Sequence, residues 1–518
     1  MSHLVSPARP LNLADHYLER NLARGRGDHV AIIVDHPDSG VAKFTYRDVS
    51  ARSAQVGHEL LARGLGLEDR VFIILEDGIE WVTAFFGAQK IGATTMFLNP
   101  AVTAEELAFY LSDSRARAVI TTAAVAARLP TERPHLRVVL EMDTAEASLR
   151  ARPTTLETAK TSEEDFAIWL YSSGSTGAPK AAVHRAYDFV YNTERYPTEV
   201  LKMTADDITL SVPKLFFGYA TGSNLLFPFH FGGTAILFPD RPTPERLFGL
   251  IAKHRATVLI NVPTLIAQMV TAYQTEKRDL SSLRVVKSAG EALPPELYQR
   301  WKAATGIEIL DGIGSAEMFH IFISGRFGEV VPGSLGTLVT GYTAQIVDED
   351  LRELPDGEVG TLRVGGGSAA AFYWQRHEKS REVLEGKWVL SSDRFMRDAK
   401  GYFWYRGRAD DVIKVAGRWL SPLEIEDVLV RHPAVAEAGA SSYTKEGLTK
   451  PMAFVILRAG ATVTEAELAA HATQHLEGYK VPRFIEIVSA LPRSDRDKLA
   501  RKPLAELASR AADKRGVS

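Results

Sequence analysis

The chain has 518 residues, of which 45% are hydrophobic, 24% charged and 9% aromatic, a composition that excludes wholesale disorder and collagen-like structure. Its 61 basic and 64 acidic residues give a net charge of −3, which argues against a general binder of nucleic acid or of membrane surfaces. There is no cysteine, so disulfides, thiolate metal sites and a thiol nucleophile are excluded. This composition suits a reducing cytosol, and we expect a cytoplasmic location.

Apolar and β-branched runs alternate with amphipathic stretches through the first three hundred or so residues. No apolar run follows a basic segment at the start, so we expect no secretory signal. Helices are predicted after Thr103, which forms a capping box with Glu106, and at residues 263–273. Strands are predicted at residues 70–75, 117–122, 166–170, 234–238, 257–262 and 284–290. Strands that alternate with helices are typical of parallel α/β sheets.

One stretch resembles a membrane span in composition, since residues 215–239 contain no Asp, Glu, Lys or Arg. Glycines at four positions and Pro228 in the middle argue against a bilayer helix. We therefore expect residues 215–239 to be a buried segment made of strand and loop, and we expect no membrane partner.

The chain changes character near residue 407, where a β-rich stretch gives way to a compact α+β pattern. Ser421 and Glu424 predict a capping box around Pro422, and Thr464 with Glu467 predicts another. Strands are predicted at residues 451–457 and 483–493. We expect an α/β protein whose large N-terminal domain, residues 1–408, holds parallel α/β sheets and a β-rich subdomain, followed by a small α+β domain, residues 409–518.

The strongest local signal is YSSGSTGAPK at residues 171–180, directly after the predicted strand at 166–170. Small hydroxyl residues and glycines present backbone N–H groups and short donors that can wrap a polyphosphate, and Lys180 adds a positive charge. The loop is not a Walker P-loop, because Lys180 is followed by Ala181 rather than Ser or Thr. The alternative interpretation is a flexible Ser/Gly linker.

At these residues the chain resembles the adenylate-forming enzymes, which include acyl- and aryl-CoA ligases. Within that family it is most similar to the benzoate-CoA ligase group, through KLFFGYATGSNLLFPF (214–229), INVPT (260–264), DGIGSAEMFHIF (311–322) and GRWLSPLEIE (417–426). The resemblance implies that the chain activates an aromatic acid with ATP and Mg²⁺ as an aryl adenylate. It also implies transfer of the acyl group to coenzyme A, with release of AMP and diphosphate.

The resemblance also implies roles for residues at matching positions. The residues implied to hold ATP or AMP are Ser172, Ser173, Gly174, Ser175, Thr176, Gly177, Lys180, Gly290, Glu291, Asp311, Gly312, Ile313, Asp393, Tyr405 and Arg408. Glu317 is implied to hold Mg²⁺ against the phosphates, and Lys498 to be the catalytic lysine. Asp311 would accept a hydrogen bond from the adenine amino group, and Asp393 would bind the ribose hydroxyls.

The small domain is implied to be mobile, pivoting near Asp410 between the two half-reactions. Its face for coenzyme A would carry Lys414, Gly417, Arg418 and Trp419. Without the resemblance, the segment around Gly417 is equally compatible with a turn before the helix that follows Ser421.

The aromatic acid is implied to lie among Phe217, Gly218, Tyr219, His320 and Ile321. No arginine or lysine obviously reaches for a second carboxylate, so a monocarboxylic aromatic acid is expected. Gly218 leaves room for an ortho substituent, which makes 2-aminobenzoate a candidate beside benzoate. A lone histidine in the apolar run EMFHIF is also compatible with a satisfied core residue.

The chain departs from the family pattern at three positions: Ile313 replaces an aromatic residue, Ala316 a threonine, and Asp497 a glycine. Two alternatives therefore stay open: an enzyme that loads the aryl group onto a carrier protein, and a nucleotide-binding protein without catalysis. Neither the acid nor the oligomeric state follows from the sequence.

Overall fold

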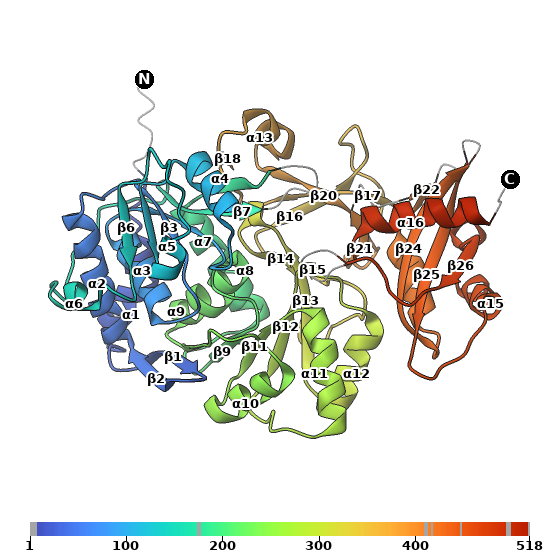
Figure 1. Cartoon of the computed structure of the whole chain (residues 1–518), viewed down its shortest axis with the longest axis horizontal. Helices are drawn as coiled ribbons and strands as arrows, with labels where there is room; N and C mark the ends of the chain where they lie inside the picture. The colour runs from blue at the N-terminus through green and yellow to red at the C-terminus, as the bar shows by residue number, and fades with distance from the viewer. Residues whose placement is uncertain are drawn as a thin grey trace. The chain divides into compact units, whose positions relative to one another are not determined.

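The computed structural model describes residues 8–172, 178–408, 413–415, 418–445, 448–493 and 499–515. The chain divides into two compact units, one of residues 1–343 with 364–389, the other of residues 344–363 with 390–518. The expected fold class is confirmed: parallel α/β sheets, a β-rich part and a small α+β part (Figure 1). The expected division into residues 1–408 and a mobile small domain of residues 409–518 stays a prediction.

Within the described residues, the first unit holds two large sheets. One sheet has the order β15 (Thr337–Leu338), β14 (Ile321–Ser324), β13 (Glu308–Gly314), β12 (Val285–Ser288), β11 (Val258–Asn261), β9 (Ile208–Ser211), β10 (Thr234–Leu237), β1 (Val30–His36), β2 (Gly40–Thr45). The other has the order β18 (Phe372–Tyr373), β8 (Lys180–Arg185), β7 (Phe166–Ser172), β4 (Thr94–Phe97), β3 (Arg70–Ile73), β5 (Ala118–Thr121), β6 (Val138–Glu141). The strands predicted from β-branched runs are confirmed, and their pairing is mainly parallel.

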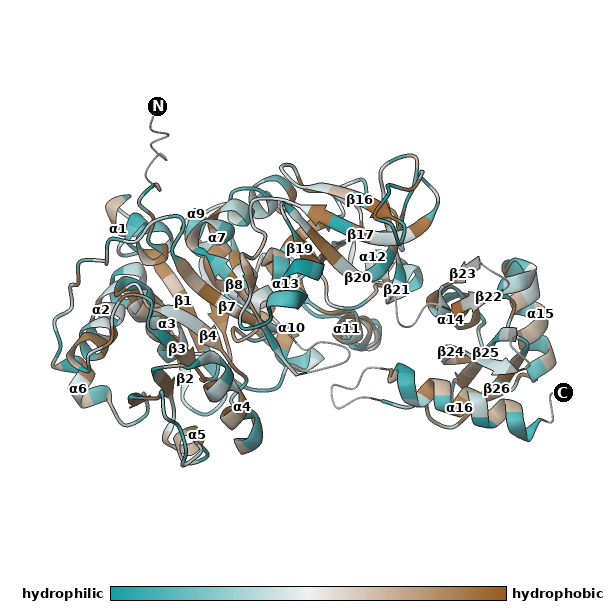
Figure 2. Cartoon of the chain, turned by 90° about the horizontal axis from the view of Figure 1, so that it is seen from above, coloured by the Kyte–Doolittle hydropathy of each residue, from teal (hydrophilic) through white to brown (hydrophobic). Residues whose placement is uncertain are grey.

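Helices cover these sheets because their apolar faces pack on the strands. Helices α10 (Pro244–His254), α11 (Pro263–Thr275) and α12 (Pro295–Thr305) share one core with β9 to β13, built around Phe248, Met269 and Trp301 (Figure 1). Helices α4 (Ala104–Ser114) and α5 (Ala123–Ala126) cover the other sheet. Further helices of this unit are α1 (Arg20–Ala23), α2 (Tyr46–Ala62), α3 (Ile79–Lys90), α6 (Glu146–Arg150), α7 (Ala186–Thr193) and α13 (His377–Val383). In Figure 2, α13 is hydrophilic, whereas the strands carry much of the hydrophobic colour.

The uncharged segment at 215–239 is mostly buried, as expected, but it is not mainly strand and loop. It forms α8 (Gly218–Thr221), a π-helical turn at Gly222–Leu226 and α9 (Phe227–Phe231) before β10. Pro228 lies in the first turn of α9, directly after the π-helical turn, where the regular α-helical hydrogen-bond pattern is already interrupted. Among the described residues, no helix is both long and apolar enough to cross a membrane.

The second unit contains β16 (Thr343–Val347), β17 (Val359–Gly365), β20 (Trp388–Arg397) and β21 (Phe403–Arg408) in one sheet, which β19 (Leu384–Glu385) extends. Its later part has β22 (Ile413–Val415) paired with β23 (Arg418–Leu420), and β24 (Val435–Lys445), β25 (Leu448–Leu457) and β26 (Phe484–Ile487) in a second sheet. Helices α14 (Pro422–Val430), α15 (Glu465–His475) and α16 (Arg501–Lys514) pack with these strands.

Two of the three predicted capping boxes are confirmed, at Thr103 and at Thr464. The third is wrong in part: Ser421 does precede α14, but its side chain caps nothing in the described structure. The Glu424 carboxylate instead accepts from Lys480 at 2.8 Å. The Glu424 carboxylate therefore forms an ion pair with a residue distant in the sequence, whereas the local pattern predicted that it would cap the N-terminus of α14.

Candidate active site

The ends of the polyphosphate-type loop lie on two paired strands. Ser172 at the end of β7 stands opposite Lys180 at the start of β8, in antiparallel register. The five expected phosphate-binding residues Ser173, Gly174, Ser175, Thr176 and Gly177 lie outside the described residues. The Ser172 hydroxyl is buried and has no hydrogen-bond partner within the described structure, which leaves it available to a ligand.

Lys180 and Glu317, two expected site residues, are brought together by a third residue. The Lys180 ammonium donates to the Tyr373 hydroxyl at 2.9 Å and lies 3.8 Å from Oε1 of Glu317. The Tyr373 hydroxyl in turn donates to Oε1 of Glu317 at 2.6 Å. Burial, together with the Glu317 carboxylate, raises the pKa of Tyr373, so the phenol keeps its proton. The ammonium group of Lys180, the phenol of Tyr373 and the carboxylate of Glu317 thus meet at the end of the β7–β8 loop.

Tyr373 was not identified by sequence reasoning, because residues 371–374 carry no motif. Its position comes from strand pairing: β18 runs antiparallel to β8, with Tyr373 opposite Ala182. The only signal in the sequence is that Tyr373, an aromatic residue with a hydroxyl group, lies in a short apolar run. Such a residue is usually part of a core, so the signal is weak.

Glu317 is held by a tight turn with buried anchors. The short 3₁₀ turn at Ala316–Met318 carries it, and His184 Nε2 donates to the Ala316 carbonyl at 2.6 Å. His184 is itself fixed by Asp188, with Nδ1 and the carboxylate 3.0 Å apart, and both side chains are fully buried. The turn is compact enough that a Cβ at Gly314 would lie 2.5 Å from the His320 carbonyl oxygen. Glycine is therefore required there.

Several residues that are expected to bind the nucleotide lie at the ends of two neighbouring parallel strands, β12 and β13. Ser288 of β12 stands opposite Asp311 of β13, and Gly290 follows with φ of +87°, a conformation that favours glycine. A Cβ at Gly312 would lie 2.7 Å from the Ile323 carbonyl oxygen. The Glu291 carboxylate accepts from the Thr264 hydroxyl at 2.7 Å, so it braces the start of α11.

Asp311 is a buried carboxyl group with spare hydrogen-bonding capacity. Its side chain is 6% exposed, and Oδ1 has no hydrogen-bond partner within the described structure. Burial raises the pKa of Asp311 to about 7, although the Ser288 hydroxyl and the Gly312 N–H act in the opposite direction. An amino donor such as that of adenine would satisfy the orphaned oxygen.

We expect adenosine to bind more tightly as the pH rises through 7. The ionised carboxylate of Asp311 is the form that accepts from an amino group, so binding favours ionisation and lowers its pKa. The affinity for adenosine is therefore lower below pH 7, where Asp311 of the free protein is protonated. It reaches its maximum above pH 7, where Asp311 is already ionised. Between pH 6 and pH 8 the change should be about tenfold, measured by calorimetry. Asp311→Asn should abolish the pH dependence; an unchanged dependence would assign it to another group.

The residues expected around the aromatic acid are only partly gathered. The Tyr219 and His320 rings lie 5.5 Å apart, His320 Nε2 is 3.1 Å from the Tyr219 carbonyl oxygen, and Ile321 is buried beside them. A Cβ at Gly218 would lie 3.1 Å from Leu170, so this side chain bounds the space beside the glycine. Phe217 is 47% exposed, unlike the buried His320 and Ile321.

One basic residue that was not expected here lies beside these rings. Lys287 of β12 is fully buried, and its Nζ lies 3.4 Å from Nε2 of His320 and 4.4 Å from the centre of the Tyr219 ring. Sequence reasoning missed it because the run RVVKSAG was interpreted only as a strand. The available signal was a lysine inside that apolar run.

Most of the expected site residues of the second unit lie on two pairs of strands. Asp393 of β20 stands opposite Arg408 of β21, and the Tyr405 ring packs edge-on against Phe395 at 5.5 Å. Lys414 pairs with Trp419 and Val415 with Arg418 across β22 and β23. For Arg408, Lys414, Arg418 and Trp419 only the backbone is described, whereas Asp410, Gly417 and Lys498 lie outside the described residues.

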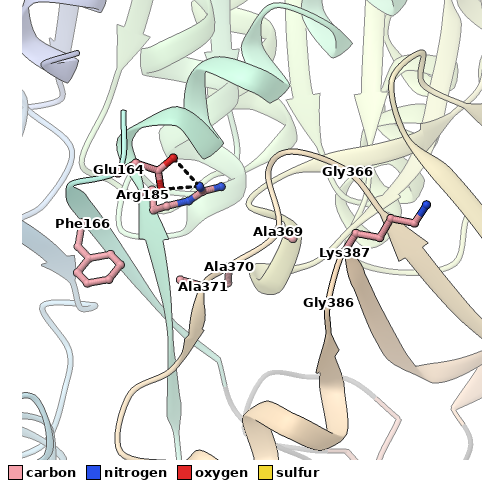
Figure 3. A pocket seen from close by; sticks show the side chains of 9 residues that line it. All are labelled: Glu164, Phe166, Arg185, Gly366, Ala369, Ala370, Ala371, Gly386 and Lys387. Atoms are coloured by element: carbon pink, nitrogen blue, oxygen red, sulfur yellow. Dashed lines mark hydrogen bonds and ion pairs between the residues drawn. The ribbon is translucent and has the colours of Figure 1, made fainter. Parts of the chain in front are cut away.

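A separate cavity of about 470 Å³ lies between β7–β8 and the segment 366–387 (Figure 3). Arg185 spans its edge through an ion pair with Glu164, at 2.8 Å, and Lys387 stands on the other side. None of the expected site residues lines it. Within the described part of the chain, no group of three or more His, Asp or Glu side chains could form a metal site.

Comparison with known proteins assigns the chain to a family. The sequence model of AMP-binding enzymes matches residues 18–374, and that of the AMP-binding enzyme C-terminal domain matches residues 424–498. The chain therefore belongs to the AMP-binding enzyme family, the adenylate-forming class that the motifs indicated.

Relatives with aromatic substrates match the chain over nearly its whole length. It is 38% identical over 505 residues to benzoate–CoA ligase of Thauera aromatica, covering 95% of each chain. It is 33% identical over 464 residues to anthranilate–CoA ligase of Pseudomonas aeruginosa, covering 86% of this chain and 89% of that one. The crystal structure of the anthranilate CoA ligase AuaEII in complex with anthranoyl-AMP superposes with a TM-score of 0.89 at 37% identity, over 99% of this chain and 100% of that chain.

Proposed function

We propose that this protein is an AMP-forming aryl-CoA ligase that acts on benzoate or a small substituted benzoate such as 2-aminobenzoate. The observation that carries the proposal is the cluster of Lys180, Tyr373 and Glu317 at the end of the β7–β8 loop. Its charges suit a nucleotide polyphosphate, and the aromatic surroundings of His320 suit a ring. The similarity to benzoate– and anthranilate–CoA ligases supports the same activity.

In the first half-reaction a carboxylate oxygen of the acid attacks the α-phosphorus of ATP, and diphosphate leaves. Both reactants are anions, so the site has to supply positive charge without consuming it. Lys180, together with N–H groups of the loop, supplies such charge on the phosphate side. No side-chain nucleophile is needed, in agreement with the absence of cysteine.

Glu317 is suited to hold a magnesium ion together with the nucleotide phosphates. A single carboxylate is appropriate for Mg²⁺, which keeps most of its coordination for water and phosphate oxygens. The bound ion would neutralise charge on the phosphates. Tyr373 orients the Glu317 carboxylate through its 2.6 Å hydrogen bond and leaves the second oxygen for a ligand.

In the second half-reaction the thiol of coenzyme A attacks the acyl carbon, the acyl–phosphate bond breaks, and AMP leaves. The roles of Asp410, Lys414, Gly417, Arg418 and Trp419 in this step, and of Asp393, Tyr405 and Arg408 in holding the nucleotide, remain part of the proposal. They rest on the motif order around residues 393–426 rather than on side-chain contacts.

A diphosphate-release assay with ATP and a panel of benzoates, with and without coenzyme A, tests the proposal. We expect acid-dependent diphosphate release and formation of an aryl-CoA thioester with equal stoichiometry. Adenylate that accumulates until a carrier protein is added would favour carrier loading instead. Nucleotide binding without release with any acid would favour a protein without catalysis, and release of ADP would contradict the proposal.

A further inference from the structure

Lys287 is a buried lysine without an acidic partner in the described part of the chain. It lies on β12 with 0% of its surface exposed, and no carboxylate within the described part of the chain is at ion-pair distance. Burying an unpaired ammonium group is costly, whereas an apolar residue of the same size would pack in this strand without that cost. Burial also lowers the pKa of Lys287 well below its usual range. A residue kept at such cost is a candidate for function.

The contacts of Lys287 leave it with unused hydrogen-bonding capacity. Its Nζ lies 2.5 Å from the Ser223 hydroxyl, and His320 Nε2 is the next polar atom, at 3.4 Å. The Ile321 N–H donates to His320 Nδ1, so the ring hydrogen is assigned to Nε2, which faces Ser223 and the Tyr219 carbonyl. His320 therefore does not accept from Lys287, and Ser223 is its one protein acceptor within the described structure.

A second buried polar group at the same place also lacks a partner. The Tyr219 hydroxyl is buried and has no hydrogen bond in the described structure, and Lys287 Nζ lies 4.4 Å from the centre of its ring. Nζ is also 4.7 Å from the ring centre of Tyr196. Aromatic faces surround the amine, and unsatisfied polar atoms stand beside them. Buried polar groups normally have partners, so a bound ligand is the natural one here.

We propose that Lys287, with Ser223 beside it, recognises an amino or hydroxyl substituent on the aromatic ring and so selects substituted benzoates over unsubstituted or alkylated ones. The inference rests on the proposed function, because Tyr219 and His320 are its ring-side residues. An amino or hydroxyl group has a lone pair that accepts from the Lys287 amine, which the Ser223 hydroxyl holds in place. A pocket built to hydrogen-bond a polar substituent discriminates strongly against an analogue that lacks it.

The test uses pairs of acids of nearly equal size that differ in polarity. For each enzyme, kcat/KM is measured for 2-aminobenzoate against 2-methylbenzoate, and for 3- and 4-hydroxybenzoate against the corresponding methylbenzoates. The wild type should prefer the polar member of at least one pair. In Lys287→Met, which keeps the length and removes the amine, that ratio should fall by about 10- to 100-fold. The exposed Lys277→Met variant should leave the ratio unchanged.

The melting temperature of the Lys287→Met variant distinguishes a role of Lys287 in substrate recognition from a structural role. Because Lys287→Met removes a buried unpaired amine, its melting temperature should equal or exceed that of the wild type. A clear fall in melting temperature, or failure to fold, would show that Lys287 is structural and overturn the inference. An active wild type whose ratios are unchanged by Lys287→Met would overturn it as well. A wild type inactive with every acid would instead contradict the proposed function.

Discussion

Glu317→Gln should lower acid-dependent diphosphate release by about 10²–10³-fold, the effect of removing one key electrostatic group from a preorganised site. Glutamine has the same shape and can still accept from the Tyr373 hydroxyl, so the turn at residues 316–318 should persist. What disappears is the negative charge that would hold Mg²⁺ against the phosphates. Initial rates at saturating ATP, with magnesium varied, measure the change.

Two further variants make the Glu317 result interpretable. Tyr373→Phe removes the hydroxyl that orients the carboxylate and should cost less than Glu317→Gln, because the charge remains. Glu349→Gln, at an exposed turn, should behave as the wild type. Equal activity of Glu317→Gln and the wild type at every magnesium concentration would remove Glu317 from the proposed site.

Lys498→Ala should nearly abolish the first half-reaction and spare the second. If the positive charge of Lys498 serves only the attack of the carboxylate on the α-phosphorus, its loss should slow diphosphate release by about 10²–10³-fold. The same variant, supplied with preformed aryl adenylate and coenzyme A, should still form the thioester. Rapid-quench measurements of the two steps, made separately, give the comparison.

The control for Lys498→Ala is Lys502→Ala, which removes an exposed lysine in the first turn of α16. It should leave both half-reactions within about twofold of the wild type, since exposed charges are largely screened. A folded Lys498→Ala protein that loses both half-reactions equally would contradict the assignment of Lys498 to adenylation alone.

Local patterns in the sequence were sufficient for most elements of the fold. The strands at β3, β5, β7 and β10 to β12 follow from runs of apolar residues, and the caps at Thr103 and Thr464 from a four-residue pattern. These features depend on interactions between near neighbours, so they can be predicted without knowing what packs against them. The order of the motifs also identified the family and the positions of Lys180, Asp311 and Glu317.

Local reasoning failed where a distant segment decided the outcome. The carboxylate of Glu424 pairs with Lys480, which is far away in the sequence, rather than with its own N-cap. The uncharged segment at 215–239 winds into short helices in the core, although its glycines and proline favoured strand and loop. In both places a tertiary contact outweighs a local preference of comparable size.

The two residues that add most to the site could be found only in the folded chain. Tyr373 reaches Glu317 because β18 pairs with β8. Lys287 reaches His320 because β13 pairs with both β12 and β14, which His320 directly precedes, and it reaches Ser223 and the Tyr219 ring from the neighbouring helical segment. Hydrogen bonds and charge interactions act over a few ångströms of space, whereas these partners are separated by dozens of residues of chain. The sequence by itself determined the family and the chemistry of ATP activation, and the tertiary structure decided which polar groups gather around Glu317 and His320.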